Sequence, residues 1–395
     1  MKPNPNPLSH YLSKKVENIR PSGIRELFDL AQRTAVVLNL GLGEPDFVTP
    51  SHIQEAAKQA LDEGYTHYTP NAGFLDLRQA IAEKLKQENG INVDPEREVI
   101  VTIGGTGTIL LAIHTVVDVG DEVLILDPCF VTYEPCVTLA GGRAVPVPLR
   151  EGDFRMLPEE VEKSIGSKTK CIILNSPMNP TGSVMAEEDI RAIANIALQN
   201  NLFVISDEVY EKLIYEDAKH FSPASIPSME NQTITINSFS KTYAMTGWRI
   251  GYAVANADVC TAMNKIQQNT VANAPAIAQR AALAALRGPQ DCVRDMVKEY
   301  DRRRRFLIKR LSKIQGFSCQ APKGAFYTFP NIKTLGRSAM EFTENLLKKG
   351  KVVVVPGGTF GQKGEGHIRI CYAVPIEKLE IAMERIEDTV KQESV

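Results

Sequence analysis

The sequence predicts an α/β protein built on a large, mostly parallel sheet, with a second, smaller α+β domain. Six short apolar runs rich in Val and Ile recur between residues 97 and 255, each bounded by Gly, Pro, Asp or Asn, as is typical of strands buried on both faces. Helix-like stretches at 108–117, 133–139 and 187–199 alternate with them, which predicts parallel β–α–β units. The predicted strands are Val99–Ile103, Val123–Leu126, Cys171–Leu174, Phe203–Ile205, Thr233–Ile236 and Ile250–Ala253.

The pattern changes after Pro289. Long helical patterns cover Asp291–Ile314 and Ser338–Lys349, and three short strand candidates accompany them, at 325–329, 351–355 and 367–371. A chain of 395 residues suits more than one domain, at ~150 residues each. We expect residues 45–286 to form the large domain, and residues 1–44, with a helix candidate at Ser22–Gln32, to join residues 287–395 in the small one. The run Arg302–Arg305 is predicted to be a solvated helix face.

Composition excludes several classes of function. Lys plus Arg is 45 and Asp plus Glu is 47, so the net charge of −2 predicts no attraction to nucleic acid or to a membrane surface. No uncharged apolar run reaches the ~18 residues of a membrane span, and the N-terminus lacks the apolar segment of a secretory signal, so we expect a cytoplasmic protein. The seven cysteines form no C-x-x-C pair and the six histidines no i, i+4 pair. We therefore expect reduced thiols and no metal site.

Segments at the ends of predicted strands are the candidates for chemistry, because ligands of open α/β sheets bind at the carboxyl ends of strands. Ile103–Thr108 places a glycine pair before a helix, where free amides could hold a phosphate, although a glycine pair at such a place is more often plain turn chemistry. It matches neither nucleotide-binding glycine motif. Asn175–Gly182 is a loop with two prolines that holds Asn179 extended, as a ligand contact or as a rigid turn.

Two more segments carry ionisable side chains. Asp207 ends an apolar strand, with Tyr210 three residues later, and is either a helix N-cap or a functional carboxylate. Lys241 follows another strand among small and apolar residues, eight positions before Arg249. A lysine that is partly desolvated near a cation has a lowered pKa and can attack carbonyls, whereas an isolated lysine in a loop would be a surface residue.

In order and residue type, these four segments resemble the class I aminotransferases of the pyridoxal-phosphate fold type I superfamily, and the resemblance covers essentially the whole chain. Leu40–Phe47, Thr66–Pro70 and Gly364–Ile370 extend it. Pro21–Phe28 and Val355–Phe360 resemble most the aspartate and aromatic aminotransferase branch common in prokaryotes. The resemblance implies a fold type I architecture with pyridoxal 5′-phosphate as cofactor.

The resemblance also implies roles for single residues. Lys241 would hold the cofactor as a Schiff base and later carry the substrate's α-proton, Asp207 would face the pyridine nitrogen, and Tyr210 would bond the ring's phenolate oxygen together with Asn179. Phe130 would stack on the ring, at a position where many relatives have tryptophan. The phosphate would be held by Gly105, Thr106, Ser238 and Arg249.

The substrate and a second subunit complete the expected site. Arg369 would clamp the α-carboxylate of the amino acid, supported by the backbone at Gly43 and by Asn179. Tyr68 resembles the tyrosine that reaches the phosphate from the neighbouring subunit, which implies a homodimer with composite active sites. Side-chain selection is expected near Ile24, Thr106 and Gln267–Ala276.

The expected reaction is a ping-pong transfer of an amino group from an L-amino acid, most of all aspartate or an aromatic one, to 2-oxoglutarate. A lyase or synthase of the same fold, or an aminotransferase for alanine or another amino acid, stays open. A ligand-sensing regulator would need a DNA-binding module ahead of Leu40, and fewer than forty residues stand there. Some bacterial aspartate aminotransferases have a lysine where this chain has Thr106, so we expect a permissive side-chain pocket.

Overall fold

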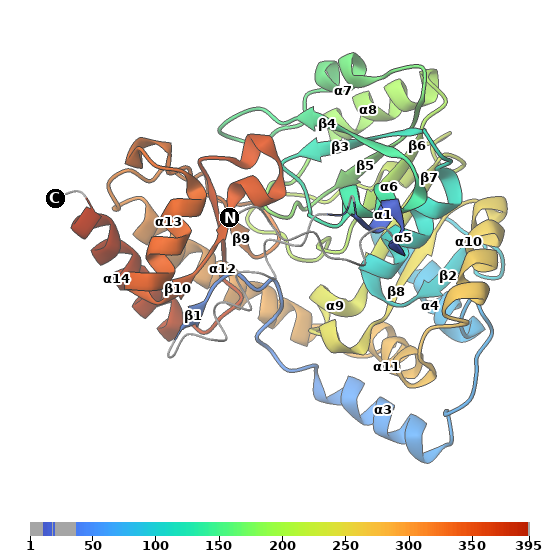
Figure 1. Cartoon of the computed structure of the whole chain (residues 1–395). Helices are drawn as coiled ribbons and strands as arrows, with labels where there is room; N and C mark the ends of the chain where they lie inside the picture. Colours follow the sequence, from blue (N-terminus) through green and yellow to red (C-terminus); the bar gives the residue numbers. More distant parts are fainter. Residues whose placement is uncertain (1–10, 18, 20–36, 394–395) are drawn as a thin grey trace.

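The apolar runs of the sequence form one seven-stranded sheet. The computed structural model describes residues 11–17, 19 and 37–393, so the predicted helix Ser22–Gln32 lies outside the described residues. The sheet occupies the right-hand part of Figure 1, in the order β2-β8-β7-β6-β5-β3-β4. Its strands are β2 (Val99–Thr102), β3 (Glu122–Asp127), β4 (Arg143–Pro148), β5 (Thr169–Asn175), β6 (Phe203–Asp207), β7 (Thr233–Ser238) and β8 (Gly251–Val254).

The sheet is mostly parallel, as predicted. Strands β4, β3, β5, β6 and β7 run parallel, and β8 is antiparallel to both β7 and β2. All six predicted strands are present, with ends within two residues of the prediction. Strand β4 was not predicted, because Pro146 and Pro148 interrupt its pattern. Its place at the sheet edge explains why prolines are tolerated there.

Helices cover both faces of this sheet, so side chains on one strand alternate between two cores. Ile100 of β2 packs with α5 and α10, whereas Val99 and Val101 pack with α4 and α11. The described helices of residues 11–287 are α1 (Lys14–Glu17), α3 (Ser51–Asp62), α4 (Leu75–Lys84), α5 (Gly104–Val116), α6 (Tyr133–Ala140), α7 (Pro158–Ser164), α8 (Glu187–Gln199), α9 (Phe239–Thr242), α10 (Ala257–Thr270) and α11 (Ala276–Arg287).

The C-terminal part has two small sheets and lies on the left of Figure 1. Its elements are β9 (Tyr327–Thr328), β10 (Val352–Val353), β11 (Val355–Pro356), β12 (Ile368–Cys371), α12 (Asp291–Leu311), α13 (Ala339–Asn345) and α14 (Ile376–Glu393). Strands β11, β12 and β9 form an antiparallel sheet, while β10 pairs in parallel with β1 (Leu38–Asn39). This pairing favours the expected two-domain division, which stays a prediction.

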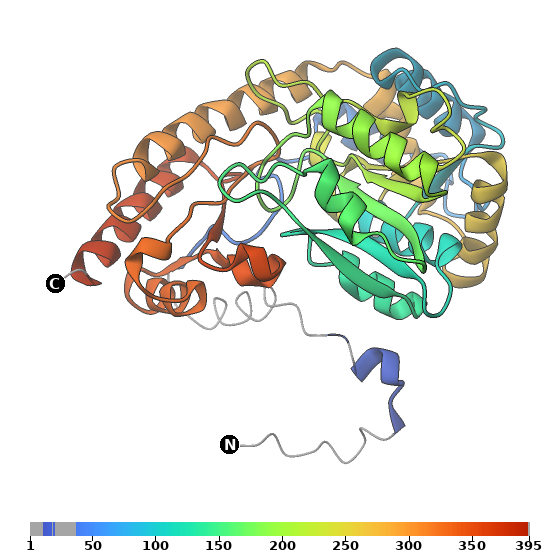
Figure 2. The same cartoon turned by 90° about the horizontal axis from the view of Figure 1, so that it is seen from above.

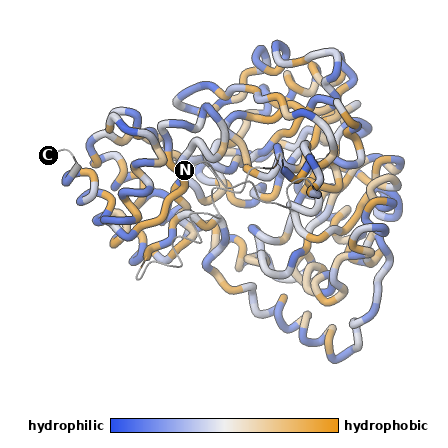
Figure 3. Tube along the Cα trace, in the orientation of Figure 1, coloured by the Kyte–Doolittle hydropathy of each residue, from blue (hydrophilic) through white to orange (hydrophobic). Residues whose placement is uncertain are grey.

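Hydropathy follows these layers. Hydrophobic residues run through the central strands, and the covering helices alternate hydrophobic and hydrophilic residues (Figure 3). Such alternation is typical of helices that bury one face and expose the other. No helix among the described residues is long and apolar enough to cross a membrane.

The predicted solvated face at Arg302–Arg305 is wrong for its two central residues. Helix α12 is the long orange helix that runs from the C-terminal part toward the large sheet in Figure 2. Arg303 and Arg304 are buried, with exposed fractions of 5% and 1%. Arg303 pairs with Asp46 at 2.8 Å, so the helix is tied to the loop after β1. Because both buried arginines have carboxylate partners, the cost of desolvating them is offset.

Arg304 should contribute much more to stability than its neighbour Arg305. Its guanidinium bonds Asp301 (2.8 Å), Glu216 (2.6 Å) and the Pro322 carbonyl (3.1 Å). Arg304→Ala should lower the free energy of unfolding by ~3 kcal/mol, because it removes a buried side chain together with its packing and its charge-assisted hydrogen bonds to Asp301 and Glu216. Arg305→Ala, which removes an exposed side chain from the same Asp301, should cost under ~1 kcal/mol. Urea unfolding at equal protein concentration measures both, and equal losses would contradict the assignment.

Candidate active site

A cavity of about 290 Å³ opens where β5, β6 and β7 end and face β9 and β12 of the C-terminal part. This is the edge of the sheet at which ligands bind in open α/β folds. The predicted residues that line the cavity are Gly43, Gly105, Thr106, Phe130, Asn179, Asp207, Tyr210, Ser238, Lys241, Arg249 and Arg369. Of the segments expected to select the substrate side chain, only Thr106 lines it; no residue of Gln267–Ala276 does, and Ile24 lies outside the described residues. Tyr68 lies outside the cavity and is 90% exposed.

One end of the cavity suits a phosphate. Helix α5 begins there at Gly104, and the amides of its first turn have no partners within the helix. Gly104 has φ +78°, and a Cβ at this position would lie 2.7 Å from Nη2 of Arg249, so the glycine lets the guanidinium approach the helix start. The hydroxyls of Ser238 and Ser240 lie 2.9 Å apart beside it. Helix N-terminus, guanidinium and hydroxyls together form a site for a dianion.

Asp207 and Lys241 form the middle of the cavity. Asp207 ends β6 and is 3% exposed; burial raises the pKa of its carboxyl to about 6, against the lowering effect of a hydrogen bond from Tyr133 (2.7 Å). Nζ of Lys241 donates to the Gly43 carbonyl at 2.6 Å, and removal from bulk water lowers the pKa of this amine to about 8. An acid that faces a ring nitrogen and an amine that is partly neutral are what the predicted chemistry needs.

Arg369 forms the other end. It projects from β12, is 2% exposed, and donates from Nη1 to Oδ1 of Asn179 (2.8 Å) and from Nη2 to the Gly41 carbonyl (2.6 Å). Its guanidinium lies between the rings of Tyr327 and Phe360, at 4.6 and 4.8 Å from their centroids. Its Nε is buried and has no hydrogen-bond partner among the described residues. No carboxylate pairs with this buried guanidinium among the described residues, so its charge favours an anionic ligand here.

Sequence reasoning missed three residues that hold the site together. Tyr133 bonds Asp207, and the hydroxyl of Tyr327 lies 2.7 Å from that of Tyr210. Asn175 donates to the Asp207 carbonyl (3.0 Å) and accepts from the backbone N–H of Asn179 (3.0 Å). Tyr133 stands three positions after Phe130 and Asn175 opens the proline loop, so both were near predicted residues. No sequence pattern reports contacts across such long separations.

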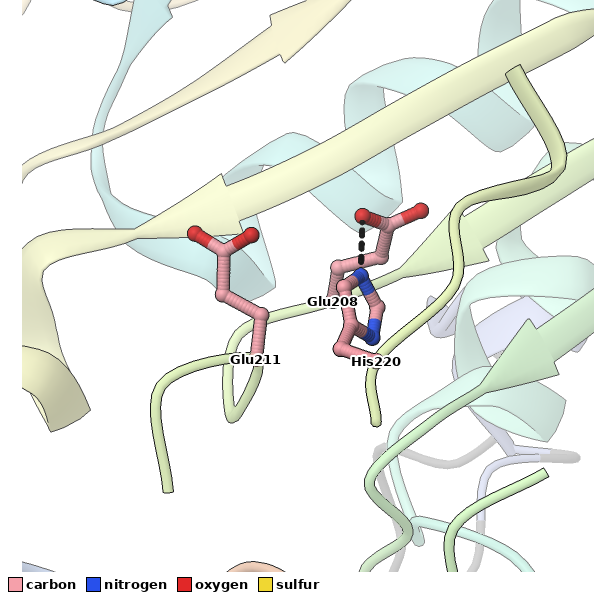
Figure 4. A group of neighbouring side chains, drawn as sticks. All are labelled: Glu208, Glu211 and His220. Carbon is pink, nitrogen blue, oxygen red and sulfur yellow. Dashed lines mark hydrogen bonds and ion pairs between the residues drawn. The ribbon is translucent and has the colours of Figure 1, made fainter. Parts of the chain in front are cut away.

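A second polar cluster, Glu208, Glu211 and His220, lies outside the cavity (Figure 4). It is the only group of three potential metal ligands among the residues that the structure describes. Glu208 accepts from the hydroxyls of two serines, at 2.9 and 2.7 Å, and bonds Nε2 of His220 at 2.8 Å. Glu211 contacts Lys84 and accepts from Asn89 at 2.7 Å. Both carboxylates are therefore engaged within the protein, as in a buried ion-pair network.

The chain belongs to the family of class I and II aminotransferases, whose model matches residues 35–386. It is thus an enzyme that transfers amino groups, and the predicted family, fold type I class and aminotransferase activity are confirmed.

Individual relatives of the chain are also named aminotransferases. The chain is 47% identical to aromatic-amino-acid aminotransferase 2 of Thermococcus litoralis and 48% identical to aspartate aminotransferase of Pyrococcus abyssi, each match covering 97% of this chain and 99% of the relative. The crystal structure of the aromatic aminotransferase from Pyrococcus horikoshii OT3 is 47% identical, with a TM-score of 0.89 over 93% of this chain and 99% of that one. Aspartate aminotransferase from Thermus thermophilus with maleate is 39% identical, with a TM-score of 0.91 over 96% and 99%.

Proposed function

We propose that this aminotransferase uses pyridoxal 5′-phosphate and moves the amino group of aspartate or an aromatic L-amino acid to 2-oxoglutarate. The observation that carries the proposal is the cavity itself, which has a dianion site at one end, the buried guanidinium of Arg369 at the other, and Asp207 and Lys241 between them. The names of the relatives, which include both aspartate and aromatic aminotransferases, support the substrate class.

The residues present fit the cofactor. When bound, it supplies an electron-accepting ring that lets the α-carbon of an amino acid lose its proton. The amides of Gly105 and Thr106 would hold the phosphate with Ser238 and Arg249.

The ring-binding residues follow from the same wall of the cavity. Phe130 would pack against the ring, with stacking but no hydrogen bond. Asp207, ionised, would hold the ring nitrogen in its protonated form. Asn179 and Tyr210 would donate hydrogen bonds to the ring oxygen.

Lys241 would act through its Nζ atom. Because burial lowers the pKa of this amine to about 8, a much larger share of it is neutral near neutral pH than of an ordinary lysine. A neutral Nζ is both a nucleophile and an acceptor for the α-proton of the substrate, which it can later return.

Arg369 would bind the α-carboxylate that amino-acid and 2-oxo-acid substrates share, with Asn179 and the backbone at Gly43. The flanking rings of Tyr327 and Phe360 contact its planar guanidinium and hold it in place. Because both substrates carry the same carboxylate, one clamp serves both halves of a ping-pong reaction.

We also propose a homodimer with composite sites, and a large domain of residues 45–286 beside a small one of residues 1–44 and 287–395. Tyr68 supports the dimer, because a tyrosine that is 90% exposed in one chain is available to a second copy. The parallel pair of β1 and β10 supports the assignment of the first residues to the small domain.

Lys241→Ala tests the proposal most directly. Wild-type protein incubated with pyridoxal phosphate and borohydride should retain the cofactor covalently on Lys241, as mass spectrometry of the peptide would report. The variant should show no such adduct and should lose turnover by several orders of magnitude, because nucleophile and proton carrier vanish together. Lys212→Ala, which changes a lysine outside the cavity, should behave like wild type. An adduct that persists in Lys241→Ala would refute the role.

Substrate range tests the effect of Thr106. Without a cation there, the enzyme should use tyrosine and phenylalanine at kcat/KM values comparable with aspartate. Thr106→Lys should improve aspartate relative to phenylalanine by roughly tenfold or more, because a charge-assisted contact contributes ~1.5–3 kcal/mol. Wild-type preference for aspartate beyond about a thousandfold, ~4 kcal/mol, would mean that another cation binds the side-chain carboxylate.

Tyr68 allows a complementation test of the dimer. Mixing Tyr68→Phe chains with Lys241→Ala chains should form hybrids with one undamaged site, so activity per chain with an intact Lys241 should exceed that of Tyr68→Phe alone. Tyr65→Phe is the matched control, because the Tyr65 ring packs on Phe74 of its own chain at 5.7 Å. A fully active monomer at high dilution would contradict composite sites.

A further inference from the structure

Tyr133 makes the one hydrogen bond from a neighbouring element to the Asp207 carboxylate among the described residues. It is the first residue of α6, is 1% exposed, and its hydroxyl lies 2.7 Å from Oδ2 of Asp207. Burial raises the pKa of this phenol well above its usual value, with the charge of Asp207 adding to the effect. The hydroxyl therefore stays protonated and can only donate to the carboxylate.

We propose that Tyr133 is a positioning residue, whose hydroxyl fixes Oδ2 of Asp207 and keeps this carboxylate ionised, leaving Oδ1 for the ligand. Oδ1 has one long bond, from the backbone N–H of Val209 at 3.3 Å. The inference deepens the proposed function and rests on it in one respect: the ligand of Oδ1 is the protonated ring nitrogen of the cofactor.

The groups around Asp207 show why the hydrogen bond from Tyr133 matters for the ionisation of this carboxyl. Burial is the largest influence and raises the pKa of the carboxyl to about 6, and the neighbouring Glu208 raises it further. The groups that lower it are Tyr133 from α6, the Val209 amide and Lys241 from α9. Tyr210 also faces the carboxylate, and Asn175 from β5 bonds only its backbone carbonyl. Among the described residues, no arginine or lysine forms an ion pair with Asp207. Buried carboxylates are usually paired with a cation, and here the neutral hydroxyl of Tyr133 takes that place.

The ring of Tyr133 has a separate task. It contacts Phe130 edge-on, with centroids 5.7 Å apart, so one side chain supports both the residue that would stack on the ring and the residue that would hold its nitrogen. Tyr133→Phe removes only the hydroxyl and preserves the contact with Phe130. This separation makes the hydroxyl's role measurable.

The test is a pH titration of Asp207 by difference infrared spectroscopy on the full chain without cofactor. The carbonyl band of a protonated buried carboxyl is assigned to Asp207 by its loss in Asp207→Asn. In Tyr133→Phe the midpoint of this band should move up by about one to two pH units. The variant loses a hydrogen bond to the charged carboxylate, so the neutral acid becomes relatively more stable. The matched control is Tyr215→Phe, which removes another buried hydroxyl, bonded to the Ala325 carbonyl, and should leave the midpoint unchanged.

The outcomes separate this inference from the proposed function. An unchanged midpoint in folded Tyr133→Phe overturns the role inferred for Tyr133. If that variant does not fold, Tyr133→His offers a ring N–H donor in place of the hydroxyl, and its midpoint must stay at or below the wild-type value. With pyridoxal phosphate and substrates added, Tyr133→Phe should lose about tenfold or more in kcat at neutral pH while KM stays within about threefold. A shifted midpoint in a chain that binds no pyridoxal phosphate supports Tyr133 and overturns the proposed cofactor.

Discussion

The parallel pairing of β5, β6 and β7 is the constraint on which the site depends. Asn175 and Asp207 are register partners on β5 and β6, and β7 ends beside them at Ser238. Because the three strands stop at the same edge, an amide, a carboxylate and a hydroxyl reach one cavity from positions far apart in the chain. Lys241 follows three residues later on α9 and enters the same space. The hydrophobic strands thus determine where the polar groups lie.

The C-terminal part supplies the remaining wall of the cavity. Arg369 and Tyr327 come from the antiparallel strands β12 and β9, and both cross to the large sheet, one to Asn179 and the other to Tyr210. The loop after β1 is held from both sides, by Lys241 at Gly43 and by Arg303 at Asp46. A shift of either part would therefore break several hydrogen bonds at once.

The fold was largely predictable from the sequence, and the site in part. Strands buried on both faces are continuous apolar runs, so six of them could be found, while β4 was missed because an edge strand can carry Pro146 and Pro148. Most of the predicted cofactor-binding residues line one cavity because they lie at or just after the ends of strands, whereas Arg369 lies within β12. Burial of Arg303 and Arg304 was not predictable, because a run of arginines is expected to be exposed unless carboxylate partners are known, and here those partners come from distant segments of the chain. The same holds for Tyr133 and Tyr327, whose hydroxyls matter only through residues 74 and 117 positions away.

Charge is distributed in the cavity so that each end has one function. Arg249 with the start of α5 forms one positive end and Arg369 the other, and the buried Asp207 lies between them, with Tyr133 as its one side-chain hydrogen-bond donor among the described residues. An ionised acid in this position favours a cation on the ring that it faces, whereas both positive ends favour anions. In the proposed function, the α-carboxylate of a substrate would bind Arg369 while Asp207 would keep the cofactor ring protonated, so the substrate would be oriented before its side chain is recognised. Recognition of the side chain is then left to residues such as Thr106, which is exposed in the first turn of α5. Substitution there can change substrate preference without moving the groups that carry the chemistry, because those groups are anchored in the strand ends.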